Sequence, residues 1–566
     1  MTGVANALAC LPACARLSRR HGAVTFCLAG ALRRCLAGAW MGFAAIAVFS
    51  SPHIHAAESD KTSQRDAKAI IGQAFIMVDG GKVVRTQLPA ELFGFNIRWT
   101  HFERDLWDER KGEVRPRVIE ELRAFPGVLY RYPGGLVANY FDWEPTLQSL
   151  AVRIAGNAKR KPVELVPQFG VDEYARFVKA VDGRLWYTLN LGGVRLGGVP
   201  GEKPEAIVAD SNKKLAKHLL EFGSWGDGPH YFELGNELDR STYQWPHAKY
   251  VSRSMASIKA ITSVDDEARF VAFLREFNWR YKPPAAPGMS RYDDFIKDVL
   301  TGLPMVNDFS LHLYYDGVLN EGGKYFHIAD AVEKLGKAFD VAQRVRGGQP
   351  VRVWVTEHGR RVPSEKRDED TAKVLTSNLS ATLSTGDFLI AMAQQPMVAG
   401  ACWQAVHGVA RQLFDASVKY GDLRPRPLLL GMRLLFLTPD WSVLSTQSRS
   451  DNHSGYPGGY DVRAAAFTNP ARDAIVVWAV NRSSQPTRAE MALKGFALKQ
   501  AMLKHDYIAG KPGVSADDPK EDYVFELDGK EVPASFSAPG VLTLTLPPSS
   551  LSRVTLKAVR DKGATS

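Results

Sequence analysis

The sequence predicts an α/β fold in which a (β/α)8 TIM barrel is followed by a C-terminal antiparallel β-sandwich domain. Between residues 90 and 438 of the 566-residue chain, eight short apolar runs alternate with amphipathic stretches, which is the count and span of a (β/α)8 barrel with long loops. After Pro439 the helical period gives way to short alternating runs separated by Asn, Gly, Pro and Ser, as in an antiparallel sandwich.

The eight apolar runs are the predicted barrel strands. In chain order they cover residues 92–97, 128–132, 185–190, 230–235, 269–273, 308–313, 351–356 and 398–403. Amphipathic stretches between them, such as 115–125, 171–181, 204–222 and 331–345, predict helices. A doubly wound open sheet is the competing fold, but its first strand normally leads into a Gly-rich phosphate turn, and the segment FGFNIRW at 93–99 does not form one.

These patterns divide the chain into five parts. We expect a leader at 1–57, an N-terminal strand within 68–89 that joins the β-sandwich, the catalytic barrel at 90–438, the sandwich at 439–557 and a disordered tail at 558–566. The N-terminal strand is the alternating segment AFIMVDGG at 74–81, so the sandwich is predicted to draw on both ends of the mature chain.

The leader has the features of a secretory signal peptide. The pair Arg33-Arg34 precedes an apolar run at 35–49, and small residues follow, so cleavage is expected after Ala56 or Ala57. The long stretch before Arg33 leaves open a start downstream of Met1, or retention of the segment as an anchor. We expect an exported protein, periplasmic or extracellular, with no stable membrane insertion after signal cleavage.

Charge and cysteine content exclude several classes of protein. The formal net charge is +10, but five arginines and no acidic residue lie in the leader, so the remaining surface is ordinary and predicts no nucleic-acid partner. Four of the five cysteines also lie in the leader, and Cys402 alone lies beyond it. Intramolecular disulfides and cysteine-based zinc sites are therefore not expected in the mature chain.

Two glutamates stand where a barrel enzyme places its reactive groups, at the carboxyl ends of strands. The fourth predicted strand runs into YFELGNELD, which places Asn236 and Glu237 just beyond it, and the seventh ends in VWVTEHG with Glu357. Two carboxyl groups about 5–5.5 Å apart can act as nucleophile and general acid/base at an acetal carbon. Either glutamate alone could instead cap a helix or pair with a surface base, but the two together favour catalysis.

Further polar and aromatic side chains fall at the same predicted rim. They are Arg131, Asn190, His312, Tyr314 and Trp403, each at or near the end of a strand. A hydroxyl from Tyr314 and a fixed cation from Arg131 could both keep Glu357 ionised. The ring of Trp403 could offer a flat apolar floor for a sugar, although a large ring is more often part of the core.

Other chemistries lack their motifs. His312, His358 and His407 are not arranged as HExxH or any comparable metal-binding spacing, and Glu357 and His358 are neighbours that point to opposite faces of an extended strand. The chain contains no GxSxG elbow and no phosphate-binding loop. We therefore expect no metal and no cofactor.

The motifs LYRYPGG, FGVDEYARFVKAV, YFELGNEL, FSLHLYY and VWVTEHG together resemble clan A of the retaining glycoside hydrolases. The run from RYPGG through YFDW and FGVDEY to LPPSSLSRVTL is most similar to family 51 α-L-arabinofuranosidases, and FELGNEL with HLYY is also similar to families 39 and 79. The resemblance covers about residues 74–556.

The resemblance implies a role for each matched residue. Glu237 would be the acid/base and Glu357 the nucleophile, and Asn236 would bind the sugar 2-hydroxyl. The remaining matched residues would orient and tune this pair (His312, Tyr314), support the nucleophile (Arg131) or form the floor of the sugar subsite (Trp403). The sequence departs from the family 51 pattern at two positions beside the sugar pocket. Leu136 follows PGG where family 51 has Asn, and His358 follows the nucleophile where family 51 has Trp.

We thus expect a secreted retaining glycoside hydrolase that acts on an oligo- or polysaccharide, most like an α-L-arabinofuranosidase. The alternative is a β-glycosidase, resembling β-xylosidases or the β-glucuronidase and heparanase group, acting on uronic-acid-containing or bacterial exopolysaccharide. Two or more basic side chains converging on the pocket would favour an acidic sugar, and the candidates are Arg98, Arg240, Arg360 and Arg361. A transglycosylase would use the same residues, and a non-catalytic polysaccharide-binding protein is the alternative from another class.

Overall fold

The structure is a computed structural model that describes residues 72–98, 106–160, 165–193, 203–223, 225, 228–238, 245–274, 292–318, 325–361, 374–407, 410–415, 423–496, 500–512, 514–517, 523–527 and 529–559. The predicted leader at 1–57 lies outside these ranges, as does most of the predicted tail. Residues Ile71–Ala155 and Val166–Ser566 form one compact unit, which contains both the barrel and the large sheet described below.

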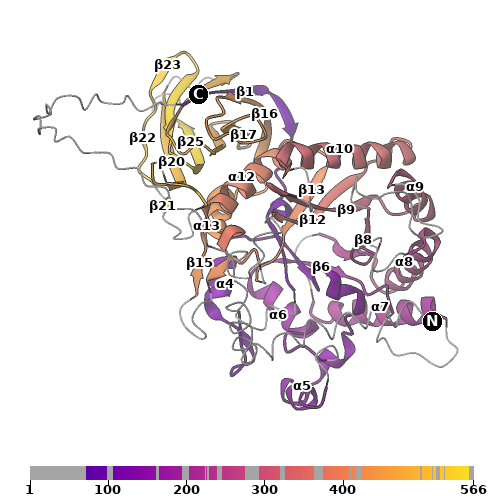
Figure 1. The fold of residues 1–566 in the computed structure, drawn as a ribbon. Coiled ribbons are helices and arrows are strands. Elements are labelled where there is room, and N and C mark those ends of the chain that lie inside the picture. The colour runs from indigo at the N-terminus through magenta and orange to yellow at the C-terminus, as the bar shows by residue number, and fades with distance from the viewer. Residues whose placement is uncertain are drawn as a thin grey trace, which may run out of the picture. The chain divides into compact units, whose positions relative to one another are not determined.

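Eight parallel strands form the closed barrel that the sequence predicts, and the fold class is confirmed (Figure 1). Each observed strand overlaps its predicted run, because each run combines high apolar content with polar or Gly-containing flanks. In chain order the strands are β2 (Gly94–Asn96), β5 (Leu129–Tyr132), β6 (Arg184–Thr188), β7 (His230–Glu233), β8 (Ala268–Phe273), β9 (Asp308–Tyr315), β12 (Arg352–Arg360) and β13 (Val398–Trp403), with β13 closing onto β2.

Helices follow the strands, and most bury one face, whereas α12 is buried almost all round. They are α4 (Pro116–Leu122), α6 (Val171–Ala180), α7 (Pro204–Leu220), α8 (His247–Thr262), α9 (Tyr292–Gly302), α10 (Ile328–Val345), α12 (Leu379–Ala393) and α13 (Pro427–Leu435), with α5 (Leu150–Asn157) in the segment between β5 and α6. Proline occupies the first turn of α4, α7 and α13, where its missing N–H costs nothing. The side chain of Asn378 caps α12 by accepting from the backbone N–H of Ala381 at 3.1 Å.

The C-terminal strands form one mostly antiparallel sheet, which we call the large sheet. Its first strand in the chain, β1 (Gly72–Arg85), precedes the barrel and pairs antiparallel with β16 (Ser442–Ser450) and parallel with β19 (Thr487–Lys494). The other members are β17 (Val462–Thr468), β18 (Ala474–Asn481), β20 (Ala501–Gly510), β21 (Tyr523–Glu526), β22 (Val532–Pro533), β23 (Phe536–Ala538), β24 (Val541–Leu546) and β25 (Ser550–Ala558).

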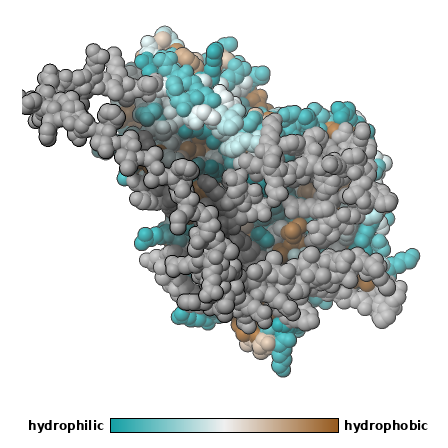
Figure 2. Space-filling view, in the orientation of Figure 1, coloured by the Kyte–Doolittle hydropathy of each residue, from teal (hydrophilic) through white to brown (hydrophobic). Residues whose placement is uncertain are grey.

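Strand β18 shows how the large sheet joins two apolar cores. All eight of its residues are buried, and alternate side chains point to opposite faces of the sheet. Ile475 and Val477 lie in a core within the large sheet, whereas Val476 and Trp478 lie in the core that continues into the barrel. The outer surface of the sheet in view is mainly hydrophilic (Figure 2).

Helix α12 contacts the large sheet at strands β17, β18 and β25, and α13 contacts it at β20 and β25. Gly386 in α12 lies directly against Leu551 of β25, where a Cβ atom would come within 2.8 Å of a Leu551 methyl carbon. Arg482, which follows β18, donates to Asp387 of α12 and to Asp316 at the end of β9, each at 2.7 Å. The large sheet is thus tied to the barrel strand that carries His312 and Tyr314. Within the described ranges, the structure contains no helix with the length and apolar character required to cross a bilayer.

Candidate active site

Glu237 and Glu357 meet at the carboxyl ends of β7 and β12, as their positions in the sequence predict. Glu237 follows β7 in a tight turn, in which Gly235 has φ 78° and Glu237 itself has φ 48°. A non-Gly residue in this left-handed region carries a conformational cost and is typical of functional sites. Glu357 follows an irregularity in the pairing of β12 with β9, where Val355 is opposite Leu311 but Glu357 is opposite His312.

The two carboxylates are close enough to act on one atom. Both side chains are buried, and a carboxylate oxygen of Glu237, one of Glu357 and a ring nitrogen of His312 all lie within 4.8 Å of one another. This spacing matches a nucleophile and an acid/base on either side of one anomeric centre.

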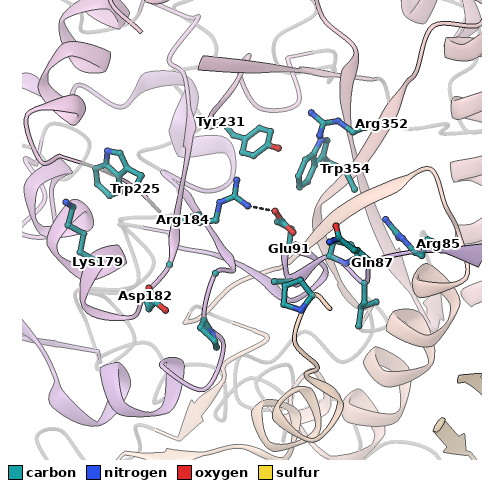
Figure 3. Close-up of a pocket in the computed structure, with 18 residues that line it drawn as sticks. Arg85, Gln87, Glu91, Lys179, Asp182, Arg184, Trp225, Tyr231, Arg352 and Trp354 are labelled. Carbon is teal, nitrogen blue, oxygen red and sulfur yellow. Dashed lines mark hydrogen bonds and ion pairs between the residues drawn. The ribbon is translucent and has the colours of Figure 1, made fainter. Parts of the chain in front are cut away.

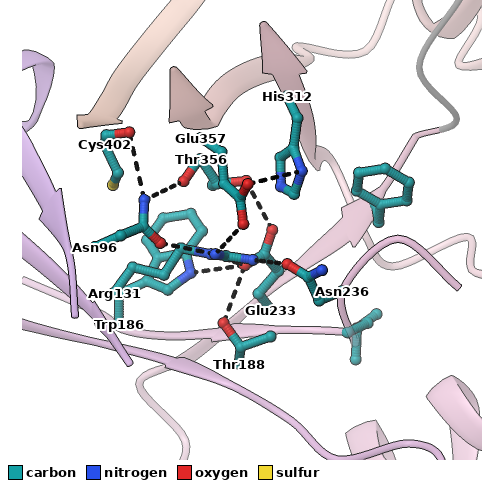
Figure 4. A network of polar contacts seen from close by, with 12 residues as sticks. Asn96, Arg131, Trp186, Thr188, Glu233, Asn236, His312, Thr356, Glu357 and Cys402 are labelled. Carbon is teal, nitrogen blue, oxygen red and sulfur yellow. Dashed lines mark hydrogen bonds and ion pairs between the residues drawn. The ribbon is translucent and has the colours of Figure 1, made fainter. Parts of the chain in front are cut away.

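Arg131 of β5 is the centre of the polar network that supports Glu357 (Figure 4). Its guanidinium donates to Glu357 Oε1 at 3.2 Å, to Asn96 Oδ1 at 2.7 Å and to Asn236 Oδ1 at 2.7 Å, and it also pairs with Glu233. Burial lowers the pKa of Arg131, but the carboxylates of Glu233 and Glu357 outweigh it and raise the pKa overall. The guanidinium is therefore a permanent cation beside Glu357.

Glu233 is a member of this network that the sequence analysis missed. It lies inside β7, fully buried, and accepts hydrogen bonds from Thr356 at 2.9 Å and from Thr188 at 3.2 Å. Burial raises the pKa of Glu233, but Arg131 and His312 outweigh it, so the pKa is lowered. The sequence did contain an indication of Glu233, which is an acidic residue in an apolar predicted strand. A buried carboxylate is stable only when it is paired with a cation or hydrogen-bonded.

Tyr314 of β9 donates its hydroxyl to Glu357 Oε2 at 2.7 Å, the contact that the sequence analysis expected. Burial, and then the charge of Glu357, raise the pKa of Tyr314 well above its usual value. The phenol therefore stays protonated and remains a donor. Glu357 accordingly accepts from both Tyr314 and Arg131, which favours its ionised form.

His312 of β9 lies between the two glutamates. Its Nδ1 is 2.7 Å from Glu237 Oε1 and 3.5 Å from Glu357 Oε2. Burial lowers the pKa of His312, but the charges of Glu357 and Glu237 outweigh it, so the pKa is raised. The imidazole holds Glu237 in a fixed orientation and supplies a proton-bearing group beside it.

Asn236 is held in place by two backbone hydrogen bonds to Asn139, and its side-chain Nδ2 remains to donate to a ligand. Its N–H donates to Asn139 Oδ1 at 2.9 Å, and its carbonyl accepts from Asn139 Nδ2 at 2.5 Å. Its Oδ1 accepts from Arg131, and its buried Nδ2 has no partner in the part of the chain that the structure describes. Asn139, a second residue that the sequence analysis missed, lies in the 3-10 helix after RYPGG, and no pattern in the sequence marked it.

Two predicted site residues, Asn190 and Trp403, do not line the cavity between the glutamates. Asn190 donates to the carbonyl of Phe141 at 3.2 Å and accepts from the N–H of Gly193 at 3.2 Å, so it shapes a loop. Trp403 is fully buried and donates to the carbonyl of Arg411 at 3.1 Å. The ring of Trp403 is therefore packing rather than an exposed floor for a sugar in this structure.

His358 points away from the site, as the alternation of an extended strand requires. Its ring stacks on Phe388 of α12 with centroids 4.5 Å apart, and its Nδ1 lies 3.1 Å from the hydroxyl of Tyr315. Burial, with Arg411 nearby, lowers the pKa of His358 to about 3. It is a neutral core residue.

A cavity of about 290 Å³ opens at the two glutamates. Its walls are formed by Arg98, Gly135, Leu136, Glu237, Tyr314, Glu357, Arg361, Gln404, Ala405, Ala410 and Arg411. Two of the four predicted arginines, Arg98 and Arg361, lie in this wall. Arg360 instead points to Asp517 at 2.7 Å, and Arg240 lies outside the described residues.

A larger cavity of about 750 Å³ lies at the opposite, amino-terminal ends of the strands (Figure 3). Arg184 and Arg352, which begin β6 and β12, line it together with Glu91, Tyr231 and Trp354. Two of its arginines are neutralised, because Arg184 pairs with Glu91 and Arg352 pairs with Asp308 at 2.8 Å. This end of a barrel usually serves stability rather than chemistry.

Glu237, His312 and Glu357 also have the spacing of a metal site. The surroundings fit a metal poorly, because a guanidinium lies 3.2 Å from Glu357 and repels a second cation. The raised pKa of His312 also opposes the neutral imidazole that a metal requires. The three groups are better suited to acid–base and nucleophilic chemistry.

The chain matches no family model and no curated protein sequence. Among solved structures, the GH51 arabinofuranosidase from Xanthomonas axonopodis pv. citri is similar with a TM-score of 0.61 and 14% identity, over 86% of this chain and 100% of that one. The thermostable GH51 α-L-arabinofuranosidase from Thermotoga petrophila RKU-1 gives 0.60 and 14%, over 85% and 100%. A family 44 xyloglucanase from Paenibacillus polymyxa gives 0.55 and 13%, over 86% and 100%. The chain shares its fold with these enzymes.

Proposed function

We propose that this chain is a retaining glycoside hydrolase that uses Glu357 as the nucleophile and Glu237 as the general acid/base. The observation that carries the proposal is the pair of buried carboxylates within 4.8 Å of each other. The groups that contact Glu357 differ from those that contact Glu237. Glu357 accepts from Arg131 and Tyr314 and is held ionised, as a nucleophile must be. Glu237 contacts His312, a group that can exchange a proton.

The reaction follows from these positions. Glu237 protonates the glycosidic oxygen while Glu357 attacks the anomeric carbon, through an oxocarbenium-like transition state, to form a glycosyl ester. Glu237, now ionised, takes a proton from water, and the resulting hydroxide displaces Glu357 with overall retention of configuration. Arg131 and Tyr314 stabilise the carboxylate that leaves in this second step. No cofactor takes part.

The resemblance of the sequence motifs and the similarity to solved GH51 arabinofuranosidases favour an α-L-arabinofuranosidase-like activity on an oligo- or polysaccharide. The alternative is a β-glycosidase that acts on uronic-acid-containing polysaccharide, which the arginines in the cavity wall favour. We also propose export to the periplasm or outside the cell, on the strength of the basic and apolar leader.

The test is a set of aryl glycosides with the wild type and two variants. Glu357→Ala should abolish turnover, and azide should restore part of it by replacing the carboxylate. Glu237→Ala should retain far more activity on activated aryl leaving groups than on natural ones, because good leaving groups need little protonation. Equal loss on both leaving groups would remove Glu237 from its role. Unchanged binding of oligosaccharide with no turnover of any substrate by the wild type would instead favour a binding protein.

A further inference from the structure

Three guanidinium groups line the same cavity as the two glutamates. They belong to Arg98, which follows β2, Arg361, which follows β12, and Arg411, which follows β13. These strands are neighbours in the barrel, so the three arginines come from one side of its mouth. The third, Arg411, lies in a loop that no sequence motif marked.

Two of these guanidinium groups lie next to the nucleophile. The Arg411 guanidinium carbon lies 4.7 Å from the centre of the Tyr314 ring, and that of Arg361 lies 5.6 Å from it. The hydroxyl of the same ring lies 2.7 Å from Glu357 Oε2. Both guanidinium groups therefore contact the Tyr314 ring, whose hydroxyl donates to Glu357, the carboxylate that would attack the sugar.

The backbone makes room for two of the three side chains. Arg411 lies across Gly359, where a Cβ atom would come within 2.7 Å of Arg411 Cδ. Arg98 lies across Gly135, where a Cβ would be 3.4 Å from Arg98 Nε, and Gly135 has φ 75°. Glycine at position 359 is therefore required for the close approach of Arg411, whereas Gly135 is required by its positive φ.

Arg98 and Arg411, which are both half-buried, also lack the carboxylate partner that other arginines of the fold have. Arg131, Arg153 and Arg482 each pair with a buried carboxylate. By contrast, no acidic side chain in the described ranges forms an ion pair with Arg98 or Arg411. The Nε atom of each is also buried without a hydrogen-bond acceptor in those ranges, a property that they share with paired arginines such as Arg153. A cation removed from water without a partner is unfavourable, so an anion in the cavity would be strongly bound.

We propose that the sugar unit attacked by Glu357 carries a carboxylate, bound by Arg411 and Arg98 with Arg361 beside them, so that the substrate is a glycoside of a uronic acid. The inference rests on the proposed two-glutamate mechanism, and it selects the uronic-acid alternative over the arabinofuranosidase-like activity. A neutral sugar such as an arabinofuranoside offers no counter-charge to Arg98 and Arg411, whereas a carboxylate forms charge-assisted, bidentate hydrogen bonds with a guanidinium.

The experiment compares aryl β-D-glucuronide and β-D-galacturonide with their methyl esters, which have the same shape without the charge, and with α-L-arabinofuranoside, β-D-xyloside and β-D-glucoside. Wild type should hydrolyse a free uronide at least about 10-fold more efficiently than its ester. Arg411→Gln and Arg98→Gln should each lower kcat/KM on the uronide by about 10–100-fold more than on its methyl ester. Arg488→Gln, an exposed change of the same charge on β19, should have no effect.

The outcomes separate this inference from the proposed function. Hydrolysis of neutral glycosides with no preference for the uronides, dependent on Glu357, would overturn the acidic substrate and keep the glycosidase. If no aryl glycoside is cleaved, calorimetry of glucuronate-containing oligosaccharides on Glu357→Gln decides. If adding Arg411→Gln to the Glu357→Gln variant weakens oligosaccharide binding about 10-fold or more, the inference is supported. If both variants bind the oligosaccharide equally, or neither binds it, the inference is contradicted.

Discussion

The Nδ1 atom of His312 lies 2.7 Å from Oε1 of Glu237, in a buried site where the second glutamate is 3.5 Å from the same nitrogen. One imidazole therefore contacts both carboxylates that the mechanism requires. Its proton reduces the repulsion between them, and its ring keeps Glu237 in position for transfer to a leaving group. The arrangement makes the site sensitive to the charge of a single histidine.

We predict that His312→Gln removes a pH-dependent part of the stability. The pKa of His312 is raised in the folded state, so its contribution is complete below the ordinary histidine value of about 6.5 and is lost as the pH rises through the higher folded value. Urea unfolding should show a larger deficit of the variant at about pH 6 than at about pH 9. A deficit that grows with pH would contradict the assignment.

Tyr314→Phe should lower kcat by about 10–100-fold, because it removes a hydrogen bond to a charged carboxylate while keeping the ring. The neighbouring Tyr315 is a matched control, because its hydroxyl contacts His358 and Thr385 on the other side of the strand. Tyr315→Phe should lower the unfolding free energy and leave kcat close to the wild-type value. Equal effects of the two variants on kcat would mean that the Tyr314 hydroxyl has no special role.

Arg131→Met should destabilise the fold by about 3–5 kcal/mol, because it leaves the fully buried Glu233 without its partner. Adding Glu233→Gln should recover much of this stability in thermal unfolding. The double variant should still be inactive, since Glu357 and Asn236 have both lost the hydrogen bond that Arg131 donates. Recovery of activity together with stability would show that Arg131 is structural only.

Two glycines in helices should respond in opposite directions to alanine. Gly386→Ala in α12 should cost about 1–3 kcal/mol, because the new methyl group overlaps the side chain of Leu551 in the large sheet. Gly336→Ala in α10 has open space around it and should stabilise by about 0.5–1 kcal/mol through helix propensity. Similar shifts in melting temperature for both variants would contradict the packing of α12 on β25.

The sequence analysis was most successful where a local pattern carries the information. Apolar runs marked all eight barrel strands, and the residues that end them included Glu237, Glu357, His312 and Tyr314, which the structure brings together. It was least successful for Trp403 and Asn190, which also end strands or nearly so. Position at a strand end does not decide whether a side chain turns into the cavity or packs behind it.

The sequence by itself determined the order of strands and helices and the two carboxylates at the strand ends, because periodicity and strand-end chemistry are local properties. Only the tertiary structure decided which further groups, such as Glu233 and Arg411, join the residues predicted around those carboxylates. Closure of the barrel brings Arg131 and Glu233 together from β5 and β7, and the loop after β13 carries Arg411 to the ring of Tyr314. These contacts join residues about 100 positions apart, and no local pattern records them.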